Sequence, residues 1–350
     1  MIFTCANSES QDYYETTVPN KPATQGGAYM QDTCCNKGLI DEVYIKVVEE
    51  FDMETFQSDL AEKYKDSLSS ILAYKRYYED TIKETGKRPS KYEDPSDLIK
   101  IHDIYNSTPI EGYRNPNSNG KIAYYFRGCA YVNYITDAAF REMEFFSKMM
   151  SMDVITSHFR VAPEVTFHEM LEDTLNGYLY ILELGYHPKD IMFFGDSSGA
   201  GTAIATALKI RDKDLPMPAL LALQTPWLNV TMDSASYTQK KEVDCMLGKS
   251  GLLEYAHEVY LDKTDKYNPY VSTCYADLKS FPPIITQIAS NDITYDDSIL
   301  LMRQARKANV TFRLEVYEDM FHEFMCFREL AAAQRAWLNL GIFIKEHVNQ

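Results

Sequence analysis

The stretch Ile191-Met192-Phe193-Phe194-Gly195-Asp196-Ser197-Ser198-Gly199 decides how this chain folds. Its four leading apolar residues predict a short buried strand, and the apolar spacing over residues 199–210 predicts a helix directly after it. A serine between Gly195 and Gly199 is typical of a sharp strand-to-helix turn, because glycine tolerates unusual backbone angles and close neighbours. Such a turn exposes the Ser197 hydroxyl and aims the helix N-terminus at developing negative charge. The alternative is a structural Gly-Ser turn before a packed helix. The surrounding sequence must decide between these two interpretations.

Short apolar runs alternate with helical patterns on both sides of this turn. The predicted strands cover residues 98–105, 122–126, 154–159, 191–194, 220–224, 283–289 and 312–316, and the predicted helices cover 138–150, 169–184, 199–210, 296–307 and 329–347. This alternation predicts an α/β fold in which helices flank a mostly parallel central sheet. A ligand site is then expected at the carboxyl ends of the strands.

The remaining segments divide the chain further. Residues 1–38 are rich in small polar residues without an apolar period and predict an N-terminal arm, loose or wrapped. In residues 39–95, apolar residues recur three or four positions apart, which predicts a helical cap segment. The core then comprises 96–229 and 267–350. Residues 230–266 show no strand pattern, and we interpret them as a cap insertion that forms a lid with the N-terminal helices.

A serine hydroxyl is a weak nucleophile that needs a base and a group that orients the base. Asp292 follows the predicted strand 283–289, and His322 follows the next one, so both are expected at carboxyl strand ends. Asp296 and Asp297 are alternative acids, but they fall where a helix begins and are better explained as cap or dipole partners. The order of serine, acid and histidine is the one expected of a nucleophile elbow in an α/β hydrolase.

Several motifs occur in an order that resembles one family, the hormone-sensitive-lipase-like esterases of the α/β-hydrolase fold. They are Gly195-Asp196-Ser197-Ser198-Gly199, which is similar to GDSAG, Phe159-Arg160-Val161-Ala162-Pro163-Glu164, which is similar to YRLAPE, and Thr225-Pro226-Trp227-Leu228, Phe281-Pro282-Pro283 and Asp319-Met320-Phe321-His322. The resemblance extends from about Tyr113 to the C-terminus. It implies that Ser197 is the nucleophile, His322 the general base and acid, and Asp292 the group that holds the imidazole.

The sequence departs from this family after the predicted strand 122–126. It has Arg127-Gly128-Cys129-Ala130 where the family has His-Gly-Gly-Gly. The resemblance implies an oxyanion hole made by the backbone N–H groups of Cys129, Ala130 and Ser198. Backbone donors survive a change of side chain, yet a Cβ at two glycine positions shifts the loop if it requires positive φ.

Arg127 and Cys129 introduce new side chains beside the expected nucleophile. Arg127 either binds an anionic substrate or pairs with an acid such as Glu164, and we expect the pairing. Cys129 has no adjacent base in the sequence, so we expect it to be inert or modulatory rather than nucleophilic.

Composition narrows the classes of partner. The formal charge is 35 − 51 = −16 and no basic run exceeds two residues, which argues against nucleic acid and polyanionic membranes. No apolar stretch is long enough for a membrane span, so we expect no stable membrane insertion and a cytoplasmic location. The seven cysteines and seven histidines show no metal-ligand spacing, so no cofactor and no metal is expected.

These observations predict a serine carboxylesterase that hydrolyses small-molecule esters with short or compact acyl groups. One alternative is a non-catalytic ligand-binding protein on the same fold, suggested by the altered glycine loop. Another is the hydrolysis of acetyl-sugars or amides by the same triad, because leaving-group specificity lies in loops that the sequence does not place. The oligomeric state stays open, with a homo-oligomer as one alternative.

Overall fold

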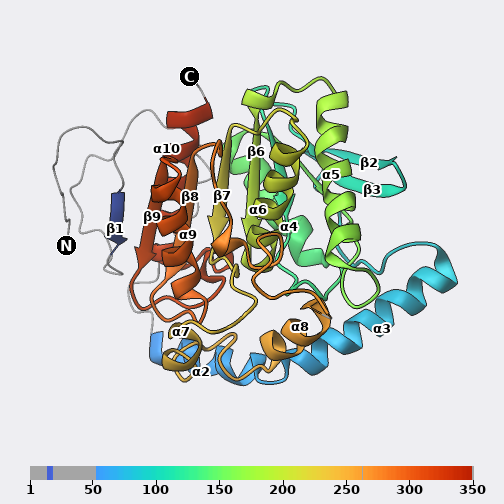
Figure 1. Cartoon of the computed structure of the whole chain (residues 1–350). Helices are drawn as coiled ribbons and strands as arrows, with labels where there is room; N and C mark the ends of the chain where they lie inside the picture. The colour runs from blue at the N-terminus through green and yellow to red at the C-terminus, as the bar shows by residue number, and fades with distance from the viewer. Residues whose placement is uncertain (1–13, 19–52, 262, 349–350) are drawn as a thin grey trace.

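The computed structural model describes residues 14–18, 53–261 and 263–348 and is organised around one sheet (Figure 1). The strands are β1 (Tyr14–Val18), β2 (Ile99–Tyr105), β3 (Thr108–Arg114), β4 (Ile122–Phe126), β5 (Asp153–Ser157), β6 (Ile191–Asp196), β7 (Leu220–Gln224), β8 (Ile284–Ala289) and β9 (Phe312–Tyr317). Their order is β1-β9-β8-β7-β6-β4-β5-β3-β2. Among the strands of the described residues, only β2 with β3 and β3 with β5 pair antiparallel. Strands β2 to β9 form the mostly parallel sheet that the sequence predicts, and β1 adds a parallel strand beside β9.

Helices cover both faces of this sheet. They are α2 (Met53–Tyr64), α3 (Ser67–Thr85), α4 (Asp137–Met150), α5 (Phe167–Glu183), α6 (Ser197–Asp212), α7 (Ser236–Gln239), α8 (Leu252–Leu261), α9 (Tyr295–Lys307) and α10 (Ala331–Val348), with short 3₁₀ turns η1 (Pro188–Asp190), η2 (Thr273–Tyr275) and η3 (Phe324–Cys326). Successive strand residues face opposite sides, so Tyr125 and Phe194 pack in the core under α4 and α10. Their neighbours Tyr124 and Phe193 pack in the core under α5, α6 and α9. The α/β fold with helices on both faces is therefore confirmed.

The edge of the sheet differs from the prediction at one strand. The segment Thr108–Arg114 forms β3, between β2 and β5, although its Pro109 and Gly112 are typical of turns. A Cβ at position 112 would lie 2.1 Å from the carbonyl oxygen of Val154, so the strand pairing itself requires glycine there. Local propensity gave no sign of this strand, because its stability comes from pairing with two neighbours.

The helices of the two predicted cap segments lie together beyond the carboxyl ends of the strands. Figure 1 shows α2, α3, α7 and α8 below the ends of β7 and β9. Leu68 of α3 packs in the same apolar cluster as Leu253 of α8 and Val132 of the loop after β4. In the predicted arm, β1 pairs with β9, and the rest of residues 1–38 and the start of the predicted cap segment lie outside the described residues.

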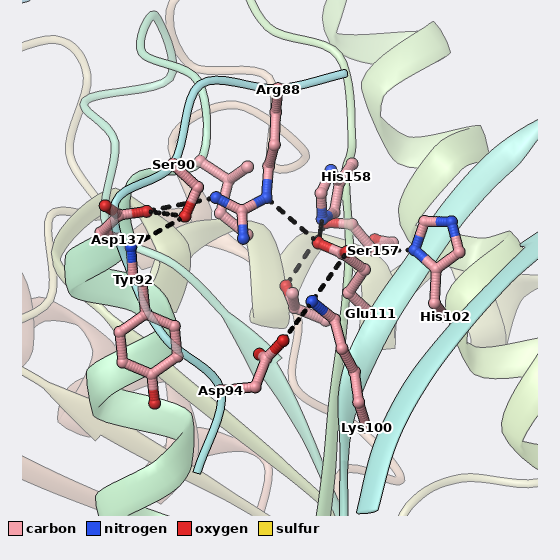
Figure 2. Close-up of polar contacts among 12 residues, drawn as sticks. Arg88, Ser90, Tyr92, Asp94, Lys100, His102, Glu111, Asp137, Ser157 and His158 are labelled. Atoms are coloured by element: carbon pink, nitrogen blue, oxygen red, sulfur yellow. Dashed lines mark hydrogen bonds and ion pairs between the residues drawn. The ribbon is translucent and has the colours of Figure 1, made fainter. Parts of the chain in front are cut away.

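A polar cluster centred on the buried Glu111 ties the chain after α3 to the sheet (Figure 2). Arg88 Nε lies 3.3 Å from the Glu111 carboxylate on β3, and its Nη1 lies 3.2 Å from Asp137 at the start of α4. The same carboxylate lies 2.9 Å from His158 Nε2 and 3.0 Å from His102 Nδ1. Glu111 is buried. The cluster therefore joins the exit of the helical cap segment to β2, β3, β5 and α4.

The ionisation of Glu111 is expected to stabilise the fold. Burial opposes ionisation, but His158, Arg88 and His102 outweigh it and lower the pKa of Glu111 from 4.5 to about 2. A lowered folded-state pKa adds stability above pH 4.5 and loses it as the pH falls from 4.5 toward 2. We expect Glu111→Gln to lower the free energy of unfolding by about 3–5 kcal/mol at pH 7, because Arg88 loses a buried partner. Urea unfolding between pH 2 and 7 measures this difference.

The matched control is Glu242→Gln, which removes an ion pair with Lys249 in which both side chains are exposed. An exposed pair contributes little, so this variant should unfold like the wild type. If Glu111→Gln were as stable as the control, or if its deficit did not shrink below pH 4.5, the assignment of Glu111 as a stabilising carboxylate would be wrong.

Candidate active site

The predicted strand-to-helix turn joins β6 to α6 at Ser197. Ser197 has φ 50°, in the left-handed region that side chains rarely adopt. A Cβ at Gly199 would lie 2.0 Å from the carbonyl oxygen of Phe126, and a Cβ at Gly195 would lie 2.8 Å from the carbonyl oxygen of Gly199. Both glycines are therefore required by close backbone approach, and the strained turn holds Ser197 at the carboxyl end of the sheet.

The structure brings Ser197, Asp292 and His322 into one hydrogen-bonded chain. His322 Nε2 lies 2.9 Å from Ser197 Oγ, and His322 Nδ1 lies 2.8 Å from Asp292 Oδ2. The other carboxylate oxygen, Asp292 Oδ1, accepts hydrogen bonds from the backbone N–H and the hydroxyl of Thr294, at 2.8 and 2.9 Å. All three members of the chain are buried. The serine is thus hydrogen-bonded to a potential base, and that base is oriented by an acid whose own rotamer is held.

Electrostatics favour the protonated imidazole. Burial alone would lower the pKa of His322, but the contact with Asp292 outweighs burial, and the pKa is raised to about 9. Glu323 and Asp244 raise this pKa further through their charges. The site is therefore arranged to stabilise an imidazolium, which is the charge that forms when a histidine removes a serine proton.

The alternative acids lie elsewhere. Asp297 Oδ2 accepts hydrogen bonds from the N–H groups of Leu228 and Asn229 and from the Tyr237 hydroxyl. Asp296 Oδ2 accepts the N–H of Ser236. Both therefore bind the chain that follows β7 rather than His322.

The loop after β4 lies against the turn at Ser197. Cys129 N–H donates to Ser198 Oγ at 3.0 Å, and Tyr131 N–H donates to the same oxygen at 3.3 Å. Ala130 N–H has no hydrogen-bond partner in the described part of the chain, and Ser198 N–H lies in the first turn of α6, where helix N–H groups lack intrahelical partners. Of the three N–H groups predicted for the oxyanion hole, that of Cys129 is thus already engaged.

The side chains at the two glycine positions have different consequences. Ala130 has φ 48°, so this position does require the left-handed region, and strain of this kind costs on the order of 1–3 kcal/mol. Cys129 is a buried free thiol, and the Ser198 hydroxyl lies 3.7 Å from its sulfur. The loop is held in its strained form partly by the Ser198 hydroxyl.

The expected pairing of Arg127 with Glu164 is wrong. Glu164 pairs instead with Lys75 of α3, at 2.8 Å. Arg127 is buried, its Nη2 donates to the carbonyl oxygen of Phe159 at 3.2 Å, and its guanidinium carbon lies 3.9 Å from the centroid of the Phe159 ring. Lys75 reaches Glu164 from the cap helix because α3 crosses this loop, a contact between residues 89 positions apart that no local pattern encodes.

Two further acids near His322 were not anticipated. Asp244, in the cap insertion, is buried and accepts N–H groups of Met246, Leu247 and Ile293, the last of which follows Asp292 directly. No sequence signal marks it. Glu323 is the second acid, and its place next to His322 in the sequence could have drawn attention to it.

Two broader features bear on the chemistry. Within residues 53–261 and 263–348, no group of three or more His, Cys, Asp or Glu side chains is arranged to hold a metal ion. In the same part of the chain, none of the helices combines the length and apolar character that a membrane crossing needs.

Comparisons with known proteins agree with this fold. A family model described as alpha/beta hydrolase fold matches residues 123–326. An acetyl-hydrolase from Streptomyces hygroscopicus is 33% identical over 193 residues, which cover 55% of this chain and 64% of that protein. An esterase from Acinetobacter venetianus is 31% identical over 176 residues, which cover 50% of this chain and 58% of that protein. The matched segment thus spans less than two thirds of either relative.

Solved structures share the fold. The hormone-sensitive-lipase homologue EstE7 from a metagenome library has a TM-score of 0.74 and 22% identity, and the match covers 85% of this chain and 99% of that one. An esterase from the bacterial hormone-sensitive lipase family has a TM-score of 0.67 and 23% identity, over 89% of this chain and 99% of that one.

Proposed function

We propose an activity for this chain from the premise that it belongs to the α/β-hydrolase-fold family, and from the resemblance of its motifs to those of the hormone-sensitive-lipase-like esterases. The activity is hydrolysis of carboxylic esters with short or compact acyl groups. The observation that supports it most is the hydrogen-bonded chain from Ser197 through His322 to Asp292. The relatives named acetyl-hydrolase and esterase are consistent with a small acyl group.

The proposed reaction proceeds in two halves. Ser197 Oγ attacks the carbonyl carbon while His322 Nε2 takes its proton, and the bond to the alcohol oxygen breaks as His322 returns that proton to the leaving alcohol. A water molecule then attacks the acyl-serine and gives a proton to His322. Collapse of this second intermediate releases the carboxylic acid and restores Ser197. Asp292 holds the imidazole and stabilises its positive charge in both halves.

The N–H groups of Ala130 and Ser198 are the donors best placed to bind the developing oxyanion. Cys129 N–H, which already donates to Ser198 Oγ, is the third candidate and would have to exchange partners. Each well-placed donor of this kind contributes about 100- to 1,000-fold to turnover. Helix α6 adds the positive end of its dipole at the same place.

The lid is proposed to shape the acyl pocket. Tyr260 of α8 stacks on Tyr131, with ring centroids 4.1 Å apart, next to the loop that carries the oxyanion donors. The ring centroid of Phe56 in α2 lies 6.0 Å from that of Phe321, the residue before His322. Apolar side chains from both parts of the cap therefore approach the site from two sides, as expected for a site that accepts a small apolar acyl chain.

A second candidate is a ligand-binding protein without turnover. The engaged Cys129 N–H and the strained Ala130 favour it, because an oxyanion hole with one donor fewer loses much of its catalytic power. The presence of all three triad side chains in contact favours the esterase.

The experiment that separates them uses the full chain with p-nitrophenyl acetate, butyrate and octanoate, and a fluorophosphonate label followed by peptide mass mapping. An esterase of the proposed kind turns over acetate and butyrate faster than octanoate and carries one label, on Ser197. Folded protein that neither turns over an ester nor takes the label would overturn the proposal in favour of ligand binding. Faster turnover of octanoate would overturn the acyl-chain assignment alone.

A further inference from the structure

The loop that carries Asp292 is held from two sides. On the core side, Asn291 N–H donates to the carbonyl oxygen of Met320 at 2.9 Å, two residues before the triad histidine. On the side of the predicted cap insertion, Ile293 N–H donates to Asp244 Oδ2 at 3.0 Å. The residues directly before and after Asp292 are therefore hydrogen-bonded to different parts of the chain.

The rotamer of Asp244 is fixed by its own turn. The side chain is buried, and Oδ1 accepts the N–H groups of Met246 and Leu247 at 2.9 and 3.0 Å. Because a carboxylate is planar, these two bonds fix the direction in which Oδ2 points, which is toward Ile293. The turn is also compact, since a Cβ at Gly248 would lie 2.0 Å from a carbonyl oxygen of the same turn.

The ionised form of Asp244 suits these three donors, because a carboxylate only accepts hydrogen bonds. Burial raises the pKa of Asp244 and the charge of Asp292 raises it further, while His322 opposes both, which leaves the pKa at about 6. Asp244 is therefore a carboxylate at pH 8, where it accepts the N–H of Ile293 without carrying a proton of its own.

Two further side chains of the predicted cap insertion bind the same loop. Ser236 Oγ of α7 donates to the carbonyl oxygen of Ile293 at 2.8 Å. Lys240 Nζ donates to the carbonyl oxygen of Ser290 and lies 4.5 Å from the centroid of the Tyr295 ring, at the start of α9. Both backbone groups of Ile293 are thus bound by side chains from the insertion.

We propose that Asp244 is a positioning residue through which the cap insertion holds Asp292 against His322. The inference rests on the proposed esterase function. The bond to Ile293 N–H restrains the backbone next to Asp292, and the 2.8 Å contact of its Oδ2 with His322 Nδ1 depends on that backbone. A misplacement of about 1 Å in such a site lowers turnover by about 100-fold. The cap insertion thus completes the triad in addition to shaping the acyl pocket.

Asp244→Asn tests the proposal in the full chain at pH 8. Its amide oxygen can still accept the two N–H groups of its own turn, but the amide NH₂ then faces Ile293 N–H, donor against donor. We expect kcat for p-nitrophenyl acetate to fall about 10- to 100-fold with little change in KM, because the interaction acts on the transition state. The matched control is Glu242→Gln, which removes an exposed acid of the same insertion and should keep both constants.

Lys240→Met tests the same role without altering Asp244. It removes the contacts with Ser290 and with the first residue of α9, so we expect a smaller fall of kcat in the same direction. Its control is Lys241→Met, which removes an exposed ion pair with Glu254 and should match the wild type. Wild-type kcat in Asp244→Asn, or a rise of KM alone, would overturn the positioning role. If Asp244→Asn does not fold, the same outcomes in Lys240→Met decide the question.

A proton NMR signature tests this role independently of turnover. The Nδ1–H of His322 donates to a buried carboxylate, and a proton in such a charge-assisted hydrogen bond resonates far downfield. At pH 8 we expect this resonance in the wild type and in Glu242→Gln, its loss in Asp292→Asn, and its displacement in Asp244→Asn. A wild-type position in Asp244→Asn would overturn the positioning role. Absence of wild-type turnover and labelling would instead overturn the proposed function, and the NMR comparison would still decide whether Asp244 places Asp292.

Discussion

Ser197→Ala is expected to abolish ester hydrolysis, with a loss of at least about 10⁴-fold in kcat/KM. The physical reason is that the covalent route disappears: no other hydroxyl of the described residues lies within hydrogen-bond reach of His322 Nε2. The residual rate would come from a water molecule activated in the same place. Initial rates with p-nitrophenyl acetate, measured together with fluorophosphonate labelling, check this prediction.

Ser69→Ala serves as the matched control, because Ser69 lies exposed on α3 and the same atoms are removed. It should keep wild-type rates and labelling. Retention of labelling or of more than a tenth of the wild-type rate in Ser197→Ala would contradict the assignment of Ser197 as nucleophile and would point to another residue, with Cys129 the first to examine.

Asp292→Asn is expected to lower kcat/KM by about 10⁴-fold while the fold is retained. An amide can occupy the space of the carboxylate, but it cannot stabilise the imidazolium and it can present an N–H to His322 Nδ1, which selects the wrong tautomer. The pH dependence should change as well. Because the base must be neutral, wild-type kcat/KM is expected to rise with pH toward about 9, where His322 titrates. Without Asp292 the effect of burial dominates and lowers the pKa of His322. The rise of the residual kcat/KM with pH should therefore begin at a lower pH than in the wild type.

The neighbouring acid Asp296 provides the comparison. Asp296→Asn removes a carboxylate that accepts the N–H of Ser236 and does not contact His322. This substitution should leave unchanged the pH range over which kcat/KM rises. Asp292 would not be the acid that acts on His322 if kcat/KM fell further in Asp296→Asn than in Asp292→Asn. The same conclusion would follow if kcat/KM of Asp292→Asn rose over the same pH range as in the wild type.

The predictions from sequence were most successful where a local pattern carries the structure. Short apolar runs marked β4, β6 and β7 because buried parallel strands are apolar on both faces. Strands β8 and β9 continued the same series although they include the polar residues Gln287 and Glu315. The turn at Ser197 could be recognised because Gly195 and Gly199 are both needed for backbone contact. Strand β3 was missed because it is stabilised by its neighbours rather than by its own composition.

At the candidate site, the structure brings the three predicted triad residues into contact, but other contacts differ from the prediction. Ser197, Asp292 and His322 could be selected because parallel strands bring their carboxyl ends to one edge of the sheet. Arg127 was assigned the wrong partner, because Glu164 is taken by Lys75 from a cap helix far away in the sequence. Asp244 carries no motif at all and reaches the site only because the cap insertion folds back onto the loop after β8.

The ordered motifs of the sequence resemble those of one family, and the sequence by itself determined the α/β order of elements, the strained serine turn and the chain order of serine, acid and histidine. These follow from periodicity and from glycine positions, which are local properties. Only the tertiary structure decided that Cys129 N–H is engaged by Ser198, that Arg127 is buried against Phe159, and that Glu323 lies beside the imidazole of His322. Those contacts depend on how separate loops pack at one sheet edge, where hydrogen bonds and charges are distributed among residues that no local pattern connects.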